Sequence, residues 1–305
     1  MSLSYTTTEL LSSIKKRAFI PTSQSTFQDT DILRLANEEL QLEIVPMLMR
    51  VRENYFVQKQ DVAVVGGQAN YPLPIRAIGS KLSDVQFLDT STNLKSLSKL
   101  HFSEVPGLNG PSFLGTPQYF YLQSGDIYTV PTPNAAIGTL RLYFFQRPNN
   151  LVTLSSVSTI SSISTNSVTV NNVPSDYDTS GTYDIIKNQP DFRSYGIDLT
   201  IVSIVGTTIT FTDSLPTGIS VGDFVCLAGE APVPQVPVEL HPILAQRTSI
   251  KMLEAMGDKE NMQLSEAKLK TMQDSALSLF TNRIENEDQK ISSNNSLMNW
   301  VTSRF

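Results

Sequence analysis

Three patterns in the sequence predict an α+β fold: a helical bundle built from N- and C-terminal helices, with an antiparallel β domain and an inserted, internally repeated β barrel or sandwich. Apolar residues recur every three or four positions near both ends of the chain, as in amphipathic helices. Between these ends the period changes to two, which is typical of strands. One strand-rich segment also repeats itself at a constant offset of 41 residues. The predicted segments are N-terminal helices at 1–60, the β domain at 61–150, the repeated acidic insert at 151–232, C-terminal helices at 233–290 and a tethered tail at 291–305.

The stretch ILRLANEELQLEIVPMLMRVRENYFV, residues 32–57, predicts a long amphipathic helix. Asp29 or Thr30 is placed to cap its first turn, and Pro46 should kink or break it because proline lacks a backbone donor. Glu39 and Glu43 share one face of this helix, and nearby arginines favour a solvated surface over a catalytic carboxylate pair. A shorter helix is predicted from about Thr7 to Arg17.

The next region reads as antiparallel strands bounded by Gly, Pro and Asn, with a long loop at EVPGLNGPSFLGTP. Gly66-Gly67 lies between two strand-like runs and predicts a hairpin turn. It has the spacing of neither a dinucleotide-binding loop nor a P-loop. His101 is expected inside a strand, KLHFSE.

The repeat places ISSISTNSVTV over IVSIVGTTITF, and continues where SGTYDII corresponds to VGDFVCL. Each copy predicts three strands. Because one copy cannot bury its apolar face alone, two copies should pair into a small six-stranded barrel or sandwich. Cys226, the one cysteine, corresponds to Ile185 and is expected as a buried small hydrophobe.

Two helices are predicted near the C-terminus. Pro242 suits the start of the first and Gly257 its end, while Asp258 is placed to cap the second, which runs to about Asn286. At 1.5 Å per residue the second helix would be about 40 Å long. We expect partner contacts from an apolar seam on this helix and from anchors in the tail, although the tail could equally fold back on its own helices. The candidate interface residues are Leu269, Met272, Ala276, Leu279, Leu297, Met298, Trp300 and Phe305.

The formal net charge of −6 argues against a general nucleic-acid binder, and it is unevenly distributed. Between residues 151 and 232 there are eight carboxylates and two cations, which accounts for the whole excess. A solvated, loop-rich surface is the expected explanation. The acidic residues are Asp176, Asp178, Asp184, Asp191, Asp198, Asp213, Asp223 and Glu230.

Few residues point to chemistry, and we expect no enzymatic activity, cofactor or metal. His101 and His241 fit no known spacing for a nucleophile or a metal ligand, so structural roles are expected for both. The string DYDTSG, residues 176–181, matches the first half of a calcium loop, but Lys187 stands where the loop needs glutamate. A polar turn is therefore expected there. The sequence also shows no apolar run long enough for an export signal or a membrane anchor.

Several stretches resemble tailed-bacteriophage head-to-tail connector (adaptor) proteins. They are DTDILRLANEELQLEIVPMLMRVRENYFV, QANYPLPIRAIGSKLSDVQFLD, GTPQYFYLQSGDIYTVPTP with LRLYFFQRPNNLV, and VELHPILAQRTSIKMLEAMGD. The resemblance covers the first 150 residues and the C-terminal helices. It is one of pattern and order, and the repeated insert is not expected in the common adaptor core.

The resemblance implies a non-enzymatic virion protein, made in the host cytoplasm and located in the neck between capsid and tail. It would form a homo-oligomeric ring, a dodecamer, below the portal protein and above downstream tail or neck proteins. Genomic DNA would pass through the lumen without specific contacts, and no membrane is involved. The alternative is a tail accessory or receptor-binding protein that uses its β domains.

Overall fold

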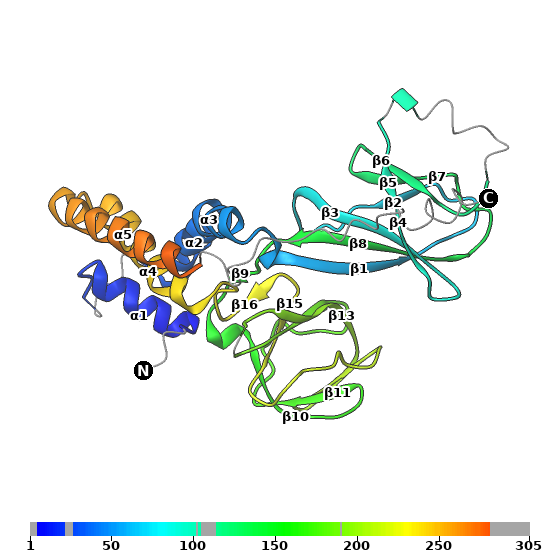
Figure 1. The fold of residues 1–305 in the computed structure, drawn as a ribbon. Helices are drawn as coiled ribbons and strands as arrows, with labels where there is room; N and C mark the ends of the chain where they lie inside the picture. The colour runs from blue at the N-terminus through cyan, green and yellow to red at the C-terminus, as the bar shows by residue number, and fades with distance from the viewer. Residues whose placement is uncertain (1–4, 22–26, 102, 105–113, 190, 281–305) are drawn as a thin grey trace, which may run out of the picture.

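The computed structural model describes the chain except residues 1–4, 22–26, 102, 105–113, 190 and 281–305. It confirms the predicted α+β class. Helices from both ends of the chain pack together, a long β arm projects from them, and a β barrel lies beside the base of the arm (Figure 1).

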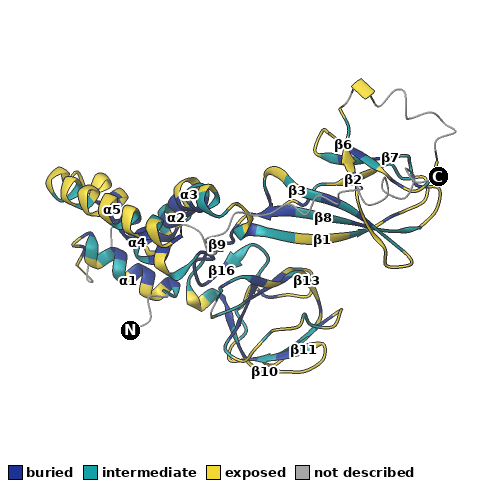
Figure 2. Ribbon diagram, viewed as in Figure 1, coloured by how far each residue is buried: buried dark blue, intermediate teal, exposed yellow. Residues whose placement is uncertain are grey.

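The helical part is built around the helix α4, which contacts three other helices. Figure 2 shows that buried residues gather where these helices meet, while much of α5 is exposed. Fully buried side chains in this core come from both ends of the sequence and include Ile14, Ile32, Leu40, Ile44 and Leu244. The α-helices are α1 Thr7–Arg17, α2 Asp29–Glu39, α3 Val45–Val51, α4 His241–Met256 and α5 Lys259–Phe280, with short helical turns η2 Glu53–Phe56, η4 Leu154–Ser156 and η5 Val238–Leu240.

The long helix predicted around Pro46 does not break at the proline. Instead, a π-helical turn, η1 (Leu40–Ile44), joins α2 to α3, and the Val45 N–H donates to the Leu40 carbonyl oxygen five residues earlier. Pro46 has no backbone N–H to donate, and the wider turn lets the helix continue past it. The predicted cap is also wrong: Gln28 is at the N-cap of α2 without a side-chain hydrogen bond, and Asp29 pairs with Lys15 instead.

The start of α1, the end of α4 and the start of α5 follow the sequence signals closely, whereas the predicted end of α5 near Asn286 lies outside the described residues. Thr6 and Glu9 form a capping box at the start of α1. Gly257 ends α4 in the left-handed conformation, with φ 74°. Asp258 accepts a hydrogen bond from the Asn261 N–H at 3.2 Å, as expected of the cap of α5.

The β arm consists of two four-stranded sheets, ordered β1-β8-β3-β4 and β2-β7-β6-β5, whose apolar faces enclose one core. The strands are β1 Val57–Ala63, β2 Asn70–Pro72, β3 Ala77–Asp89, β4 Leu94–Ser96, β5 Ser98–Lys99, β6 Tyr119–Gln123, β7 Asp126–Val130 and β8 Gly138–Gln146. Two local predictions fail. Gly66-Gly67 forms a turn, but it joins strands of different sheets rather than a hairpin. His101 lies outside a strand, because the short β5 ends at Lys99.

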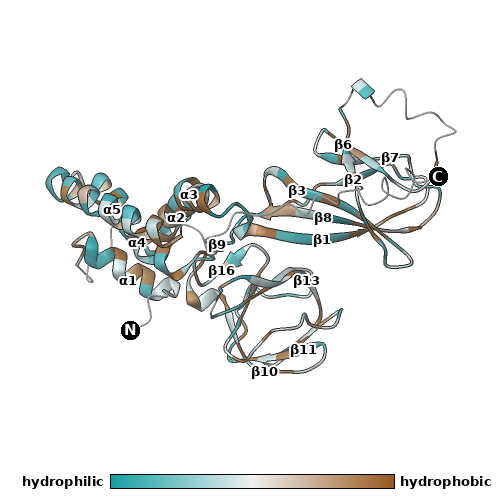
Figure 3. Cartoon of the chain, in the orientation of Figure 1, coloured by the Kyte–Doolittle hydropathy of each residue, from teal (hydrophilic) through white to brown (hydrophobic). Residues whose placement is uncertain are grey.

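The repeat forms a closed six-stranded barrel, ordered β10-β11-β14-β13-β12-β15, which confirms the predicted pairing of two three-strand copies. Equivalent positions of the copies share one core, for example Val168 with Ile209 and Val170 with Phe211. Figure 3 shows hydrophobic residues interspersed along these strands, as expected for a barrel with one buried face. The strands are β10 Ser158–Ile163, β11 Ser167–Val170, β12 Thr182–Ile186, β13 Ser194–Val205, β14 Thr208–Phe211 and β15 Phe224–Leu227, and a separate parallel pair is β9 Asn150–Leu151 with β16 Glu230–Ala231.

Candidate assembly surface

The helices, the arm and the barrel meet at the segment around Asn149, which is held by buried polar contacts. The Asn149 side-chain amide donates to Asp184 at 2.6 Å and to the Glu230 carbonyl oxygen at 3.0 Å. Its backbone N–H donates to the Gln235 side chain at 2.7 Å. Because buried polar groups are costly to leave unpaired, these contacts favour one arrangement of the three parts.

Arg76 connects the arm to the barrel. It precedes β3, and its guanidinium donates both to the fully buried Asp184 on β12 and to Asp198 on β13, the latter at 2.6 Å. Burial raises the pKa of Asp198, and the positive charge of Arg76 opposes that rise. An arginine shared by two carboxylates is geometrically demanding, so this contact restricts the angle between arm and barrel.

Asn37 and Gln41 fix α2 to the chain segment between arm and barrel. The Asn37 side chain accepts from the Leu151 N–H at 2.6 Å and donates to the Leu151 carbonyl oxygen at 3.2 Å. One turn later, the Gln41 side chain donates to the Pro148 carbonyl oxygen at 2.8 Å. The Asn37 amide thereby takes the hydrogen-bonding role of a neighbouring strand at the edge of β9.

Arg247 on α4 binds two carboxylates of the opening helix, Glu39 at 2.6 Å and Glu43 at 3.0 Å. Glu39 was predicted on a solvated face, but only 7% of it is exposed. The prediction failed because α4 covers that side of α2, and nothing in the local pattern reveals a partner 208 residues away. The contact of Arg247 with these two glutamates joins α4 to the opening helix.

His241 is a buried structural residue, as expected. Its Nδ1 accepts from the Tyr5 N–H at 3.0 Å, and its Nε2 donates toward the carbonyl oxygens of Pro234 and Val236, each at 3.1 Å. Burial lowers the pKa of His241 to about 4. The neutral imidazole therefore ties both ends of the chain together at the start of α4.

The other residues considered for chemistry lie apart from one another. His101 is exposed beside Ser103, while Cys226 is buried in β15, where burial raises the pKa of its thiol. Asp178 accepts hydrogen bonds from the N–H groups of Ser180 and Gly181, so the calcium-like string forms a polar turn. Within the described parts of the chain, no three His, Cys, Asp or Glu side chains gather where they could hold a metal ion.

The acidic residues of the insert are not all on a solvated surface, which corrects that expectation. Asp184 is fully buried at the joint, and Asp223 is buried against Lys187 at 3.2 Å. Asp223 also accepts from the N–H groups of Ser220 and Asn188. These two carboxylates hold loops and strands in place, whereas others, such as Asp176 and Asp213, are exposed.

The predicted interface residues are only partly described. Leu269, Met272 and Ala276 pack against the molecule's own helical core, whereas Leu279 is 66% exposed. Whether these residues also meet a partner stays a prediction. The tail residues Leu297, Met298, Trp300 and Phe305 lie outside the described residues.

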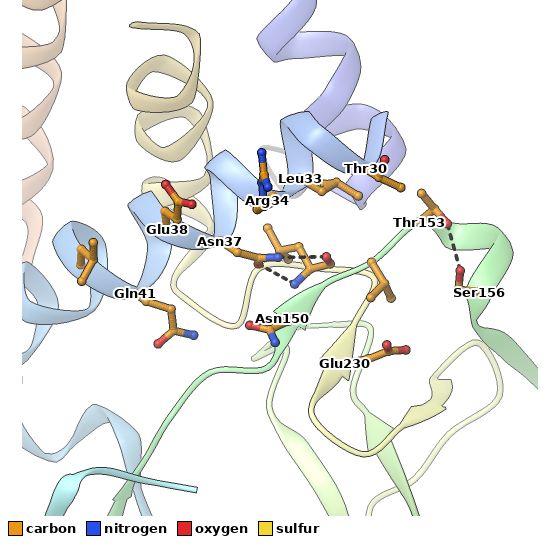
Figure 4. A pocket seen from close by; sticks show the side chains of 13 residues that line it. Thr30, Leu33, Arg34, Asn37, Glu38, Gln41, Asn150, Thr153, Ser156 and Glu230 are labelled. Atoms are coloured by element: carbon orange, nitrogen blue, oxygen red, sulfur yellow. Dashed lines mark hydrogen bonds between the residues drawn. The ribbon is translucent and has the colours of Figure 1, made fainter. Parts of the chain in front are cut away.

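A groove of about 690 Å³ lies between α2 and the β9–β16 pair (Figure 4). Its apolar lining includes Leu42 and the buried Leu33 and Leu151, its carboxylates come from Glu38 and Glu230, and Arg34 contributes one positive charge. Leu42 is 72% exposed. The groove is a concave surface with apolar groups, two carboxylates and one guanidinium, and the described chain leaves it open.

Sequence reasoning missed the residues that build the joint, above all Arg76 and Asn149, and it missed Arg247, which joins α4 to the opening helix. Asn37 carried a usable signal, since it is a polar residue beside the apolar face of a helix. The others lie in loops or on mixed helix faces, where burial depends on parts of the chain that are distant in sequence.

A comparison with protein families matches residues 5–189 to the family described as SU10 adaptor protein. The matched range continues beyond residue 150 through the first copy of the repeat, which we had not expected in the adaptor core, and it stops before the C-terminal helices. A comparison with curated proteins gives no match. In the described chain, no helix combines the length and apolar character needed to cross a membrane. Since the family match spans more than half of the 305 residues, the chain belongs to the SU10 adaptor protein family, a family of phage adaptor proteins.

Proposed function

We propose that this protein is a structural head-to-tail connector that forms a ring below the portal and lines the passage of the DNA. It would lie in the neck of the virion and contact the portal on one side and tail or neck proteins on the other. The ring would be a dodecamer. Genomic DNA would pass through the lumen without base-specific contacts.

The observation that carries the proposal is the shape of the subunit together with its family. Three parts extend from one joint, and buried charged and polar contacts from Arg76, Asn149 and Asn37 hold them in one arrangement. A subunit of fixed shape that presents different surfaces on its flanks is suited to head-to-tail contacts that close into a ring. Family membership supplies the adaptor role.

The proposal is tested by imaging the source phage with gold-labelled antibody against residues 151–232, on intact particles and on particles without tails. Label at the neck of intact particles would support a connector with outward barrels. Label at the neck that appears only after tail removal would support a connector whose barrels are covered in the complete particle. Averaged images of isolated necks would give the ring symmetry.

The alternative, a tail accessory or receptor-binding protein, draws on one observation: the barrel exposes apolar side chains such as Val202 and Val205. Label at fibre tips or on the distal tail would overturn the connector proposal in favour of this alternative.

A further inference from the structure

The C-terminal end of α1 carries a feature that its own fold does not require. Ile20 N–H donates to the Lys15 carbonyl oxygen at 2.9 Å, which places Phe19 at the left-handed position of a helix-ending motif, with φ 55°. Glycine is the preferred residue at this position, because a Cβ is disfavoured there. Phe19 also exposes 70% of its surface. The stability of a single copy therefore does not explain why phenylalanine stands at this position.

Two cations stand beside Phe19. Lys16 is exposed and forms no ion pair with any described residue, and Arg17 binds Ser13 and Gln246 but no carboxylate among the described residues. We define Lys16, Arg17 and Phe19 as the α1 knob. It combines a large exposed aromatic ring with positive charge, the composition typical of an anchor at an interface.

The groove between α2 and the β9–β16 pair has the complementary character. Leu42 offers exposed apolar surface beside the buried Leu33 and Leu151, and the groove carries two carboxylates, Glu38 and Glu230, against one cation, Arg34. Glu38 forms no ion pair with any described residue. Glu230 Oε2 is buried and has no hydrogen-bond partner in the described chain, and burial raises the pKa of that carboxyl group. An incoming cation would offset the cost of ionising Glu230.

The knob does not fill the groove of its own molecule. Phe19 instead lines a separate depression between α1 and α5, which Leu264 also lines. The knob and the groove are thus two different surfaces on one chain, which is the requirement for a head-to-tail contact between identical copies.

We propose that the α1 knob of one copy, with Phe19 as its anchor and Lys16 and Arg17 as its charges, inserts into the groove lined by Glu38, Leu42 and Glu230 of a second copy. The inference rests on the proposed function, because it names the contact by which neighbouring subunits of the ring meet. Each copy uses its knob on one side and its groove on the other, so the contact repeats around the ring.

Cysteine crosslinking tests this contact directly. Copies with Lys16→Cys are mixed with copies with Glu38→Cys, assembled on purified portal rings or concentrated alone, and treated with a short bismaleimide. The one native cysteine, Cys226, is buried, so background reaction should be small. Crosslinked dimers are expected from this pair, and not when Thr90→Cys, an exposed site on the arm, replaces Glu38→Cys.

Phe19→Gly separates docking from folding. Glycine suits the left-handed position, so the midpoint of thermal unfolding should stay unchanged or rise, while the crosslinking yield should fall at least about tenfold. Ile75→Ala, which shortens a side chain that is 95% exposed elsewhere, is the matched control and should change neither. Lys16→Glu and Glu38→Lys should each reduce assembly, and the two together in one chain should restore it.

Crosslinking and ring formation answer separate questions. Absence of the Lys16–Glu38 crosslink in rings that form normally would overturn this contact and leave the connector proposal standing. A crosslink in concentrated protein that forms no ring on the portal would support the contact and count against the connector proposal. Normal assembly of Phe19→Gly would also overturn the contact.

Discussion

The barrel and the helical part of this molecule reach stability in different ways. The barrel core consists of residues within one segment of the chain, to which equivalent positions of the two copies both contribute. The helical core instead joins residues near both ends of the sequence, such as Leu10 and Leu244, around α4. The barrel can therefore be recognised from a single segment of the sequence. The helical part depends on contacts between segments that lie far apart in the sequence.

The largest expected effect concerns the helical core. Leu40 is fully buried, so Leu40→Asp would bury a carboxylate that has no partner. The substitution should destabilise the protein by more than about 4 kcal/mol. The matched control is Leu42→Asp, because Leu42 is 72% exposed and two residues away, and it should leave thermal unfolding of the isolated protein nearly unchanged. Circular dichroism on heating measures both. A normally folded Leu40→Asp protein would refute the placement of this helix.

The joint between arm and barrel should rank second. Arg76→Leu leaves Asp184 buried without its cation, which should cost about 3–5 kcal/mol. The comparison variant is Arg141→Leu, whose partner Asp61 is 42% exposed, and it should cost no more than about 1 kcal/mol. Urea unfolding of both variants measures the two free energies. Equal losses would mean that the joint is no more important than an ordinary surface pair.

A pH effect of intermediate size is expected from His241. Its pKa in the folded protein is about 4, below the unfolded value of 6.5, so the unfolded state binds more protons in that interval. Above pH 6.5, His241 makes the free energy of unfolding neither rise nor fall with pH. As the pH drops from 6.5 to 4, that free energy should fall by about 3 kcal/mol. The free energy of unfolding, measured with denaturant across this pH range, should fall less steeply with decreasing pH in His241→Gln than in the unchanged protein. The same slope in both proteins would assign the acid sensitivity to other groups.

The smallest effect concerns the barrel core. Ile209→Val removes one buried methylene group and should cost about 1 kcal/mol. Val205→Ala, at a side chain that is 72% exposed on the neighbouring strand, should stay within about 0.5 kcal/mol of the unchanged protein. Calorimetry would also reveal whether Ile209→Val shifts a separate transition. A single shared transition would show that barrel and helices unfold together.

Much of the fold was predictable because its signals are local. Helix ends at Thr6, Gly257 and Asp258 follow from capping chemistry, which acts over one turn. The barrel follows from a repeat whose copies need each other. The failures share a cause too. Glu39 was misplaced because its partner Arg247 lies 208 residues away, and Gly66-Gly67 was read as a hairpin because sheet membership is decided by distant strands.

The candidate surface was less predictable than the fold. The predicted seam on α5 is largely turned toward the molecule's own core at Leu269, Met272 and Ala276. Phe19 could be noticed in the sequence only as one more aromatic residue. Its significance depends on a left-handed backbone and 70% exposure, which are properties of the folded chain.

The sequence by itself determined the class of fold, most helix ends and the six-strand repeat, because periodicity, capping and self-similarity act between residues that are near in the chain or equivalent in it. The tertiary structure alone decided which polar groups are buried and how the three parts are oriented. Asp184, for example, is one of eight acidic residues in a polar segment, and only the approach of Arg76 and Asn149 from the arm makes it part of a buried joint. Burial of a charge is tolerated only where partners converge, and such convergence arises from long-range packing.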